Sequence, residues 1–108
     1  MKKESKGLFR ILSIDGGGIR GILPGQIMVT LEEKIQKRTR NPNARIADYF
    51  DLIAGTSTGG ILSCAYTCPG KDGRPKFTAK EAVDIYLEFG DSIFSTPIMQ
   101  KVTSIVGL

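Results

Sequence analysis

The stretch from Asp51 to Gly60 constrains the fold of this chain more than any other segment. It begins with the apolar run Leu52–Ala54, continues as Gly-x-Ser-x-Gly around Ser57, and passes directly into the apolar segment 61–66. This order predicts a buried strand, a very tight turn and a buried helix. A nucleophile elbow, which presents a reactive serine on such a turn, requires the same arrangement.

Gly55 and Gly59 flank the serine of this motif. Ser57 would occupy a strained backbone conformation in which neighbouring Cβ atoms collide, and glycine removes those atoms so that strand and helix can close up. The Ser57 hydroxyl would then project above a helix N-terminus, which can support negative charge that develops nearby. The alternative is an ordinary glycine-rich turn that happens to contain a serine.

The segment before the elbow predicts a strand followed by a helix. Residues 8–14 form a short, partly β-branched run that glycine stops, which indicates a strand, and its near-continuous apolarity suits a parallel strand covered on both faces. Pro24 fits the first turn of the helix, where no amide hydrogen is needed. The expected apolar stripe consists of Leu23, Ile27, Leu31 and Ile35 with Met28 alongside, and the expected polar face of Glu32, Glu33, Lys34, Gln36 and Lys37.

Helical segments are also expected around and after the elbow. Residues 46–50 predict a helical turn that packs Ile46, Tyr49 and Phe50 inward, and the helix after Ser57 should be buried and end near Thr67. The capping box Thr78–Glu81 opens a last helix, in which Ala82, Val83, Ile85, Tyr86 and Phe89 are the apolar residues. Gly90 is placed to terminate it, and residues 91–108 show no clear period.

Composition limits the classes of partner. The chain has 108 residues, a formal net charge of +4, two cysteines and no histidine. Its basic residues concentrate in a flexible lead-in at 1–7 and in 34–45, where they are expected to be solvated or weakly attracted to anionic membranes. No aromatic interleaving supports nucleic-acid binding. No zinc site is expected, and Cys64 and Cys68 are expected to be reduced thiols, one of them in the core, in a cytoplasmic protein.

A second glycine cluster, Gly16–Gly18, follows the first predicted strand. Its consecutive backbone amides carry no side chains that would block a substrate, so they can stabilise the negative oxygen formed during acyl transfer. Because the carboxyl ends of parallel strands meet at one edge of a sheet, this loop and Ser57 should meet if their strands are neighbours.

The segment Gly16–Gly21 also fits the Gly-x-Gly-x-x-Gly fingerprint of dinucleotide-binding folds. That function requires an acidic residue about 20 positions later, at the end of the second strand. Glu32 and Glu33 fall inside the predicted helix, and Asp48 and Asp51 precede the second strand. Dinucleotide binding is therefore the weaker hypothesis, and no cofactor is expected.

The two glycine motifs, Asp15–Gly21 and Gly55–Gly60, together resemble the patatin-like phospholipase family. The resemblance runs from about Arg10 to Phe94 and includes the segment Ala44–Asp51 and the turn Asp72–Pro75. It implies an α/β fold of patatin type, in which a parallel sheet lies in a three-layer α/β/α core related to the α/β hydrolases.

The same resemblance implies lipid acyl hydrolysis of the phospholipase A type by a Ser–Asp dyad. Ser57 is then the nucleophile, Gly16, Gly17 and Gly18 line the oxyanion hole, and Arg20 supports that loop. The implied substrate is a phospholipid or another acyl lipid, met transiently at a membrane surface by a cytoplasmic protein that attaches there peripherally.

The sequence departs from the family pattern at the catalytic acid. That aspartate belongs to a later Asp-Gly-Gly or Asp-Gly-Ala motif, and none follows the elbow here; Asp72-Gly73 is expected to be an exposed turn. We therefore expect residues 1–108 to be the N-terminal portion of one domain with an incomplete sheet, inactive alone, and with Ile61 and Leu62 exposed. The alternative is a catalytically incomplete piece with only a binding or structural role.

Overall fold

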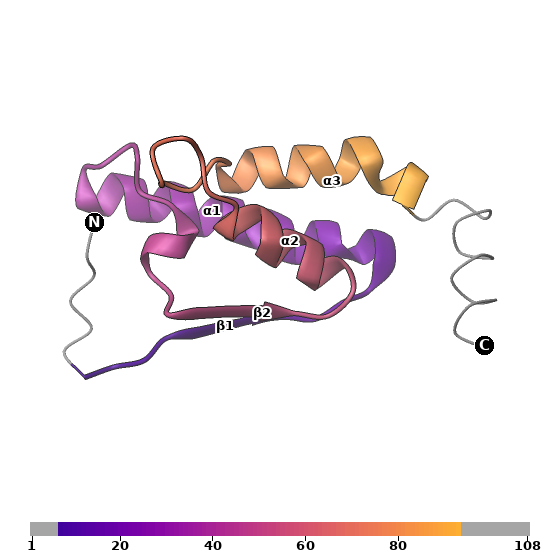
Figure 1. Cartoon of the computed structure of the whole chain (residues 1–108), viewed down its shortest axis with the longest axis horizontal. Coiled ribbons are helices and arrows are strands. Elements are labelled where there is room, and N and C mark those ends of the chain that lie inside the picture. The colour runs from indigo at the N-terminus through magenta and orange to yellow at the C-terminus, as the bar shows by residue number, and fades with distance from the viewer. Residues whose placement is uncertain (1–6, 94–108) are drawn as a thin grey trace.

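The computed structural model describes residues 7–93, apart from the side chains of Ile19 and of residues 89–93. Predictions for the lead-in at 1–6 and for the segment 94–108 lie outside this range. The elements are β1 (Ile11–Ile14), the 3-10 helix η1 (Gly18–Gly21), α1 (Ile22–Thr39), the 3-10 helix η2 (Ile46–Asp48), β2 (Leu52–Gly55), α2 (Thr58–Thr67) and α3 (Ala79–Ile93) (Figure 1).

The strands β1 and β2 are parallel neighbours, paired from Ile11 with Leu52 to Ile14 with Gly55. They form the whole sheet within residues 7–93, and the helices lie together on one side of it (Figure 1). The predicted α/β core with parallel strands and an incomplete sheet is confirmed. Both strands run toward the same end of the molecule, so the loops that follow them lie side by side.

The two faces of this sheet differ in burial. Leu12, Ile14 and Ile53 pack toward the helices as part of the core. On the opposite face Ile11 is 58% exposed and Leu52 is 49% exposed. The expectation that β1 is covered on both faces is therefore wrong for the described residues. Apolar side chains on a strand indicate which of its faces can be buried. Whether a face is buried depends on packing by segments that are remote in the sequence.

The buried side of α1 includes Met28 and Leu31 of the predicted stripe but not Leu23 or Ile27. Leu23 is 67% exposed and Ile27 is 63% exposed, while Gly25 is buried. Gly25 faces α3 so closely that an added Cβ would lie 2.8 Å from Cγ2 of Val83. Because α3 packs where α1 has its smallest residue, the first two residues of the predicted stripe lie outside this contact.

Glu32 lies in this contact region and is buried, although the sequence placed it on the polar face. Its carboxylate accepts hydrogen bonds from the backbone amides of Ile46, at 3.1 Å, and Ala79, at 2.9 Å. These amides begin η2 and α3 and have no partner within their own helices. One carboxylate therefore satisfies the starts of two helices, which explains why a charged residue is stable there.

The helix α2 lies between the sheet and α3. Leu62 and Tyr66 are buried in the core, with Ile46 and Ala82 among their neighbours. The expected exposure of Leu62 is wrong because α3 covers this side of α2, and Ile61 is half-buried. The helix is not buried all round, since Cys64 is exposed and Cys68 only partly buried, so the expected core cysteine is also wrong.

The helix α3 begins as predicted and ends later. The Thr78 hydroxyl accepts a hydrogen bond from the Glu81 amide at 3.1 Å, which confirms Thr78 as the N-cap. Val83 and Tyr86 are buried as expected. The predicted end at Gly90 is wrong, because α3 continues to Ile93. A single glycine costs a helix only about 1 kcal/mol, so it does not by itself terminate one.

Candidate active site

Ser57 occupies the strained position of a tight turn between β2 and α2. The Gly59 amide donates to the Thr56 carbonyl at 2.9 Å, which closes a four-residue turn. Ser57 has φ 53° and ψ −121°. These angles mirror those of the first central residue of a type II turn, so the turn is of type II′, and glycine dominates that position. A serine there is held against its own backbone preference.

Glycines make this turn possible by letting backbones touch. A Cβ on Gly55 would lie 2.2 Å from the carbonyl carbon of Gly59, and a Cβ on Gly59 would lie 1.9 Å from the carbonyl oxygen of Ile14. Both distances are far shorter than any real Cβ contact. The first turn of α2 therefore packs directly on the ends of both strands, and this packing fixes where Ser57 stands.

The loop after β1 meets the turn at Gly16. A Cβ on Gly16 would lie 2.8 Å from Cβ of Ser57, and the Gly16 amide donates to Oγ1 of Thr56 at 3.1 Å. The two predicted glycine loops are thus in contact at one edge of the sheet. Of the three glycine amides in the loop, that of Gly16 is hydrogen-bonded to Thr56. The amides of Gly17 and Gly18 have no protein acceptor among the described residues.

Arg20 and Tyr86 hold the glycine loop from two sides. The Arg20 amide donates to the Gly17 carbonyl at 3.1 Å, while its side chain is exposed. The Tyr86 hydroxyl of α3 donates to the Gly18 carbonyl. Sequence reasoning treated Tyr86 only as an apolar helix residue, and no local pattern marks a tyrosine that will reach a loop 68 residues earlier.

Ser57 is open to solvent, whereas the residue after it is not. Ser57, Gly16 and Gly17 are exposed, and Oγ of Ser57 forms no hydrogen bond to any residue in 7–93. Thr58 is completely buried, so its amide is closed to a substrate in this conformation. In α/β hydrolases the amide after the nucleophile is an oxyanion donor. Beside Ser57 in this structure, the exposed backbone belongs to Gly16 and Gly17 of the glycine loop instead.

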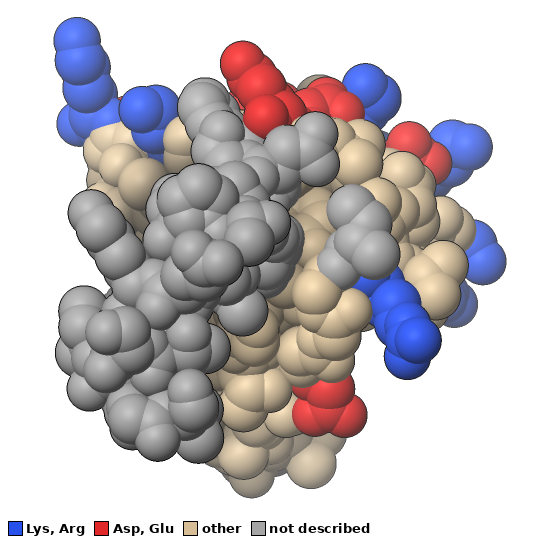
Figure 2. All heavy atoms as spheres, turned by 90° about the vertical axis from the view of Figure 1, so that its right-hand side faces the viewer, with Lys and Arg blue, Asp and Glu red and all other residues tan. Residues whose placement is uncertain are grey.

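Figure 2 shows the end of the molecule that carries both loops. Uncharged residues fill much of its described surface, and charged side chains stand mainly around the margin. A hollow of about 370 Å³ adjoins this end, between β1 and the first half of α1. Its lining consists of Leu12, Ser13, Ile14, Asp15, Gly16, Arg20, Leu23, Pro24, Ile27 and Met28. The hollow is mostly apolar, and Gly16, which contacts Ser57, forms part of its lining.

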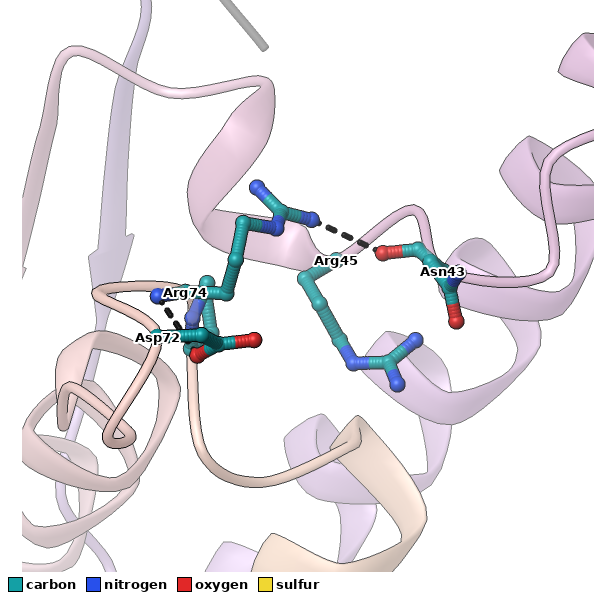
Figure 3. Close-up of a pocket in the computed structure, with 5 residues that line it drawn as sticks. Asn43, Arg45, Asp72 and Arg74 are labelled. Carbon is teal, nitrogen blue, oxygen red and sulfur yellow. Dashed lines mark hydrogen bonds between the residues drawn. The ribbon is translucent and has the colours of Figure 1, made fainter.

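Asp72 lies in an exposed turn whose geometry is self-contained (Figure 3). Its Oδ1 accepts from the Arg74 amide at 3.0 Å, and Gly73 between them has φ 76°, which glycine adopts readily. This turn follows the C-terminal end of α2, whereas Ser57 precedes its N-terminal end. A helix of ten residues separates them by about 15 Å. Asp72 therefore does not reach the Ser57 hydroxyl in this arrangement.

Arg74 from the same turn forms an ion pair with Asp48. Its Nη2 donates to the Asn43 carbonyl at 2.8 Å (Figure 3). Nη2 also donates to Oδ2 of Asp48 at 2.8 Å, and Nη1 donates to Oδ1 of Asp48. Burial raises the pKa of Asp48, but hydrogen bonds from Arg74 and the Arg45 amide outweigh it, and the pKa lies below its usual 3.8. Arg74 also lines a nearby pocket of about 210 Å³, where its guanidinium is already hydrogen-bonded to Asp48 and Asn43.

No group of three or more histidine, cysteine, aspartate or glutamate side chains in 7–93 is arranged to hold a metal ion. Nor is any helix within that range both long enough and apolar enough to cross a bilayer.

Comparison with known proteins identifies relatives over most of the chain. A family model described as patatin-like phospholipase matches residues 12–102. Patatin-1-Kuras 2 of Solanum tuberosum is 52% identical over 86 residues, which are 80% of this chain and 23% of that protein. Patatin-like protein 2 of Oryza sativa subsp. indica is 50% identical over 91 residues, which are 84% of this chain and 22% of that protein. The chain therefore spans about a fifth of the length of these relatives.

Proposed function

The chain belongs to the patatin-like phospholipase family, and we propose that it supplies the nucleophile and the oxyanion loop of a serine lipid acyl hydrolase. The observation that carries this proposal is the contact between Gly16 and Ser57. It brings a strained, exposed serine against a loop with unused backbone donors, which are two of the features that acyl transfer from an ester requires.

The reaction follows from these two loops. Oγ of Ser57 attacks the ester carbonyl and loses its proton to a carboxylate base, and the tetrahedral intermediate collapses to an acyl-serine while the base returns the proton to the departing alcohol. Water then attacks the acyl-serine with the same base, which releases the fatty acid and restores the serine hydroxyl. The family resemblance assigns the base to an aspartate that is not among residues 1–108.

The oxyanion of each tetrahedral intermediate would accept hydrogen bonds from the amides of Gly17 and Gly18. Such a donor contributes about 3–4 kcal/mol to the transition state where it has been measured in other enzymes. The N-terminus of α2 lies beneath Ser57 and adds a favourable partial positive charge. Arg20 supports this arrangement because its backbone amide donates a hydrogen bond to the Gly17 carbonyl.

An acyl lipid such as a phospholipid is the substrate class that we propose. The apolar hollow beside Gly16 and Arg20 supports it, because an acyl chain needs an apolar surface close to the reacting carbonyl. The net charge of +4 favours transient contact with an anionic membrane surface. The free thiols Cys64 and Cys68 are compatible with a reducing, cytoplasmic location.

Covalent labelling tests the proposal. The intact protein is treated with a fluorophosphonate probe, and the adduct is mapped by mass spectrometry. We expect labelling of Ser57, its loss in Ser57→Ala, and its retention in the control Ser13→Ala, which removes an exposed serine of β1. Labelling of Ser57→Ala as strong as that of the wild type would refute the assignment.

A catalytically incomplete piece is the second candidate function for residues 1–108 alone. It is favoured because Oγ of Ser57 has no basic partner in the described part of the chain, and base assistance is typically worth roughly 10²–10⁴-fold. We expect residues 1–108 expressed alone to hydrolyse p-nitrophenyl esters at no more than a trace of the rate of the intact protein. Near-full, Ser57-dependent activity would instead point to a base within the chain.

A further inference from the structure

We propose that Tyr86 is a positioning residue for the oxyanion loop: its hydroxyl fixes the Gly18 carbonyl and thereby holds in place Gly18, whose amide is one of the two proposed oxyanion donors. This inference rests on the proposed acyl hydrolase function. The hydrogen bond from Tyr86 reaches the loop at the Gly18 carbonyl, so its proposed effect on the reaction passes through the backbone of Gly17–Ile19.

The loop needs an external constraint because glycine does not supply one. Gly16, Gly17 and Gly18 are consecutive, and Gly18 has φ 60°. Without a Cβ such residues exchange readily between positive and negative φ, so the direction of their amides is not set by local sterics. An oxyanion donor is effective only when it already points at the oxygen before charge develops.

The planar peptide bond converts a fixed carbonyl into a fixed amide. In a trans peptide the C=O of one residue and the N–H of the next point in opposite directions. The Arg20 amide holds the Gly17 carbonyl at 3.1 Å and so fixes the plane that carries the Gly18 amide. Tyr86 holds the next carbonyl, that of Gly18, and so fixes the plane that carries the Ile19 amide. The two peptide planes on either side of the Gly18 Cα are therefore both anchored at their carbonyl oxygens, which fixes the backbone angles of Gly18 and with them the direction of its amide.

Tyr86 is itself held rigidly enough to act as an anchor. It is 1% exposed, and its Cζ atom lies 3.5 Å from the Cβ position of Gly21 at the end of η1. The helix α3 packs on both α1 and α2, so the ring is fixed relative to the elbow as well as to the loop. Burial raises the pKa of the Tyr86 hydroxyl above its usual 10, which keeps it protonated and able to donate at neutral pH.

A second buried tyrosine provides a matched control. Tyr66 of α2 is 2% exposed, and its hydroxyl has no hydrogen-bond partner among the described residues. Tyr86→Phe and Tyr66→Phe therefore each remove one buried phenolic oxygen from the same core. Only the first removes a bond to the oxyanion loop, so a difference between the two variants reports on that bond rather than on the loss of a hydroxyl in general.

The experiment compares both variants in the intact protein with a soluble p-nitrophenyl ester. For Tyr86→Phe we expect kcat to fall by about 10-fold or more with KM changed less than twofold, since misdirected donors weaken the transition state rather than binding of the ester. Amide hydrogen exchange in residues 17–21 should accelerate, while the helices keep their protection. Tyr66→Phe should change neither kcat nor exchange in the loop by more than about twofold.

The outcomes separate this inference from the function on which it rests. If the wild type fails to hydrolyse esters, the hydrolase proposal fails, and accelerated exchange confined to residues 17–21 in Tyr86→Phe still supports the positioning role. If the wild type is active and Tyr86→Phe matches it in kcat and in loop exchange, the positioning role is refuted. An unfolded Tyr86→Phe protein also refutes it, because the hydroxyl would then support the whole fold rather than the loop.

Discussion

Gly59 at the start of α2 packs against Ile14 at the end of β1 so closely that an added Cβ would lie 1.9 Å from the Ile14 carbonyl oxygen. Both groups are backbone, so neither can move without displacing its whole element. We predict that Gly59→Ala lowers the free energy of unfolding by about 3 kcal/mol or more, at or beyond the upper end of overpacking effects. Urea unfolding followed by circular dichroism measures this change.

Gly60→Ala is the matched control for that measurement. Gly60 is the next residue of α2, and its added Cβ would lie 3.3 Å from the Gly55 carbonyl oxygen, a contact that a small shift relieves. We expect a change within about 1 kcal/mol, because alanine also favours the helix. Equal stability of the two variants would show that the strand and helix backbones are not in the contact described.

Glu32 gives a second prediction, because its carboxylate serves two backbone donors at once. Glu32→Gln keeps one carbonyl oxygen but replaces the other oxygen with an NH₂ group, which faces the amide of Ile46 or Ala79. We predict a loss of about 2–3 kcal/mol in the free energy of unfolding, the range for hydrogen bonds to charged groups. The exposed neighbour Glu33 is the control, and Glu33→Gln should cost less than about 0.5 kcal/mol. Equal effects would mean that the two amides are satisfied in another way.

Glu32 also illustrates where the sequence stops predicting the fold. Strands, helices and their order follow from periodicity, glycine and the Thr78 cap, all of which are local signals. The buried side of α1 does not, because it is decided by α3, whose Val83 lies against Gly25. Apolar periodicity weighs side chains by their own polarity. It therefore does not predict burial of a glycine against which another helix packs, or of a carboxylate that accepts hydrogen bonds from two backbone amides.

The candidate site divides in the same way. The contact between the two glycine loops was predictable, since glycine clusters after two parallel strands must meet at one edge of the sheet. The engaged amide of Gly16 and the bond from Tyr86 to Gly18 were not. Each depends on a hydroxyl whose direction is set by tertiary packing, and a threonine or tyrosine in the sequence carries no mark of where its oxygen will point.

The ion pair between Asp48 and Arg74 predicts a defined pH dependence. The pKa of Asp48 is lower in the folded protein than its usual 3.8. Its ionised form therefore stabilises the fold fully at pH values well above 3.8, where the carboxylate is ionised in both states. This contribution declines as the pH falls from about 4 through the lower folded pKa, because the unfolded chain binds the proton first. Denaturation from pH 7 to pH 2 should show less loss of stability in Asp48→Asn than in the wild type over that window.

The same variant has a measurable cost at neutral pH. Asp48→Asn weakens two bonds from the Arg74 guanidinium, and we expect a loss of about 2 kcal/mol at pH 7. Asp84→Asn is the control, because the pair of Lys80 and Asp84 is exposed, with side-chain exposures of 74% and 57%. Its removal should cost less than about 0.5 kcal/mol. A parallel pH profile for Asp48→Asn and the wild type would contradict the assigned direction of the pKa change.

The last prediction concerns Ser57, whose strained backbone conformation should lower the stability of the fold. At φ 53° a side chain with a Cβ atom is disfavoured, and strain of this kind costs on the order of 1–3 kcal/mol. Ser57→Gly removes the Cβ, whereas Ser57→Ala removes only the hydroxyl and keeps the strain. We therefore predict that Ser57→Gly is more stable than Ser57→Ala by about 1 kcal/mol after the greater chain entropy of glycine is included. Calorimetric melting of the two variants measures this difference, and neither should react with a fluorophosphonate. If alanine stabilised the protein as much as glycine, the cost at this position would come from burying or orienting the hydroxyl, and the turn would not be the source of the strain.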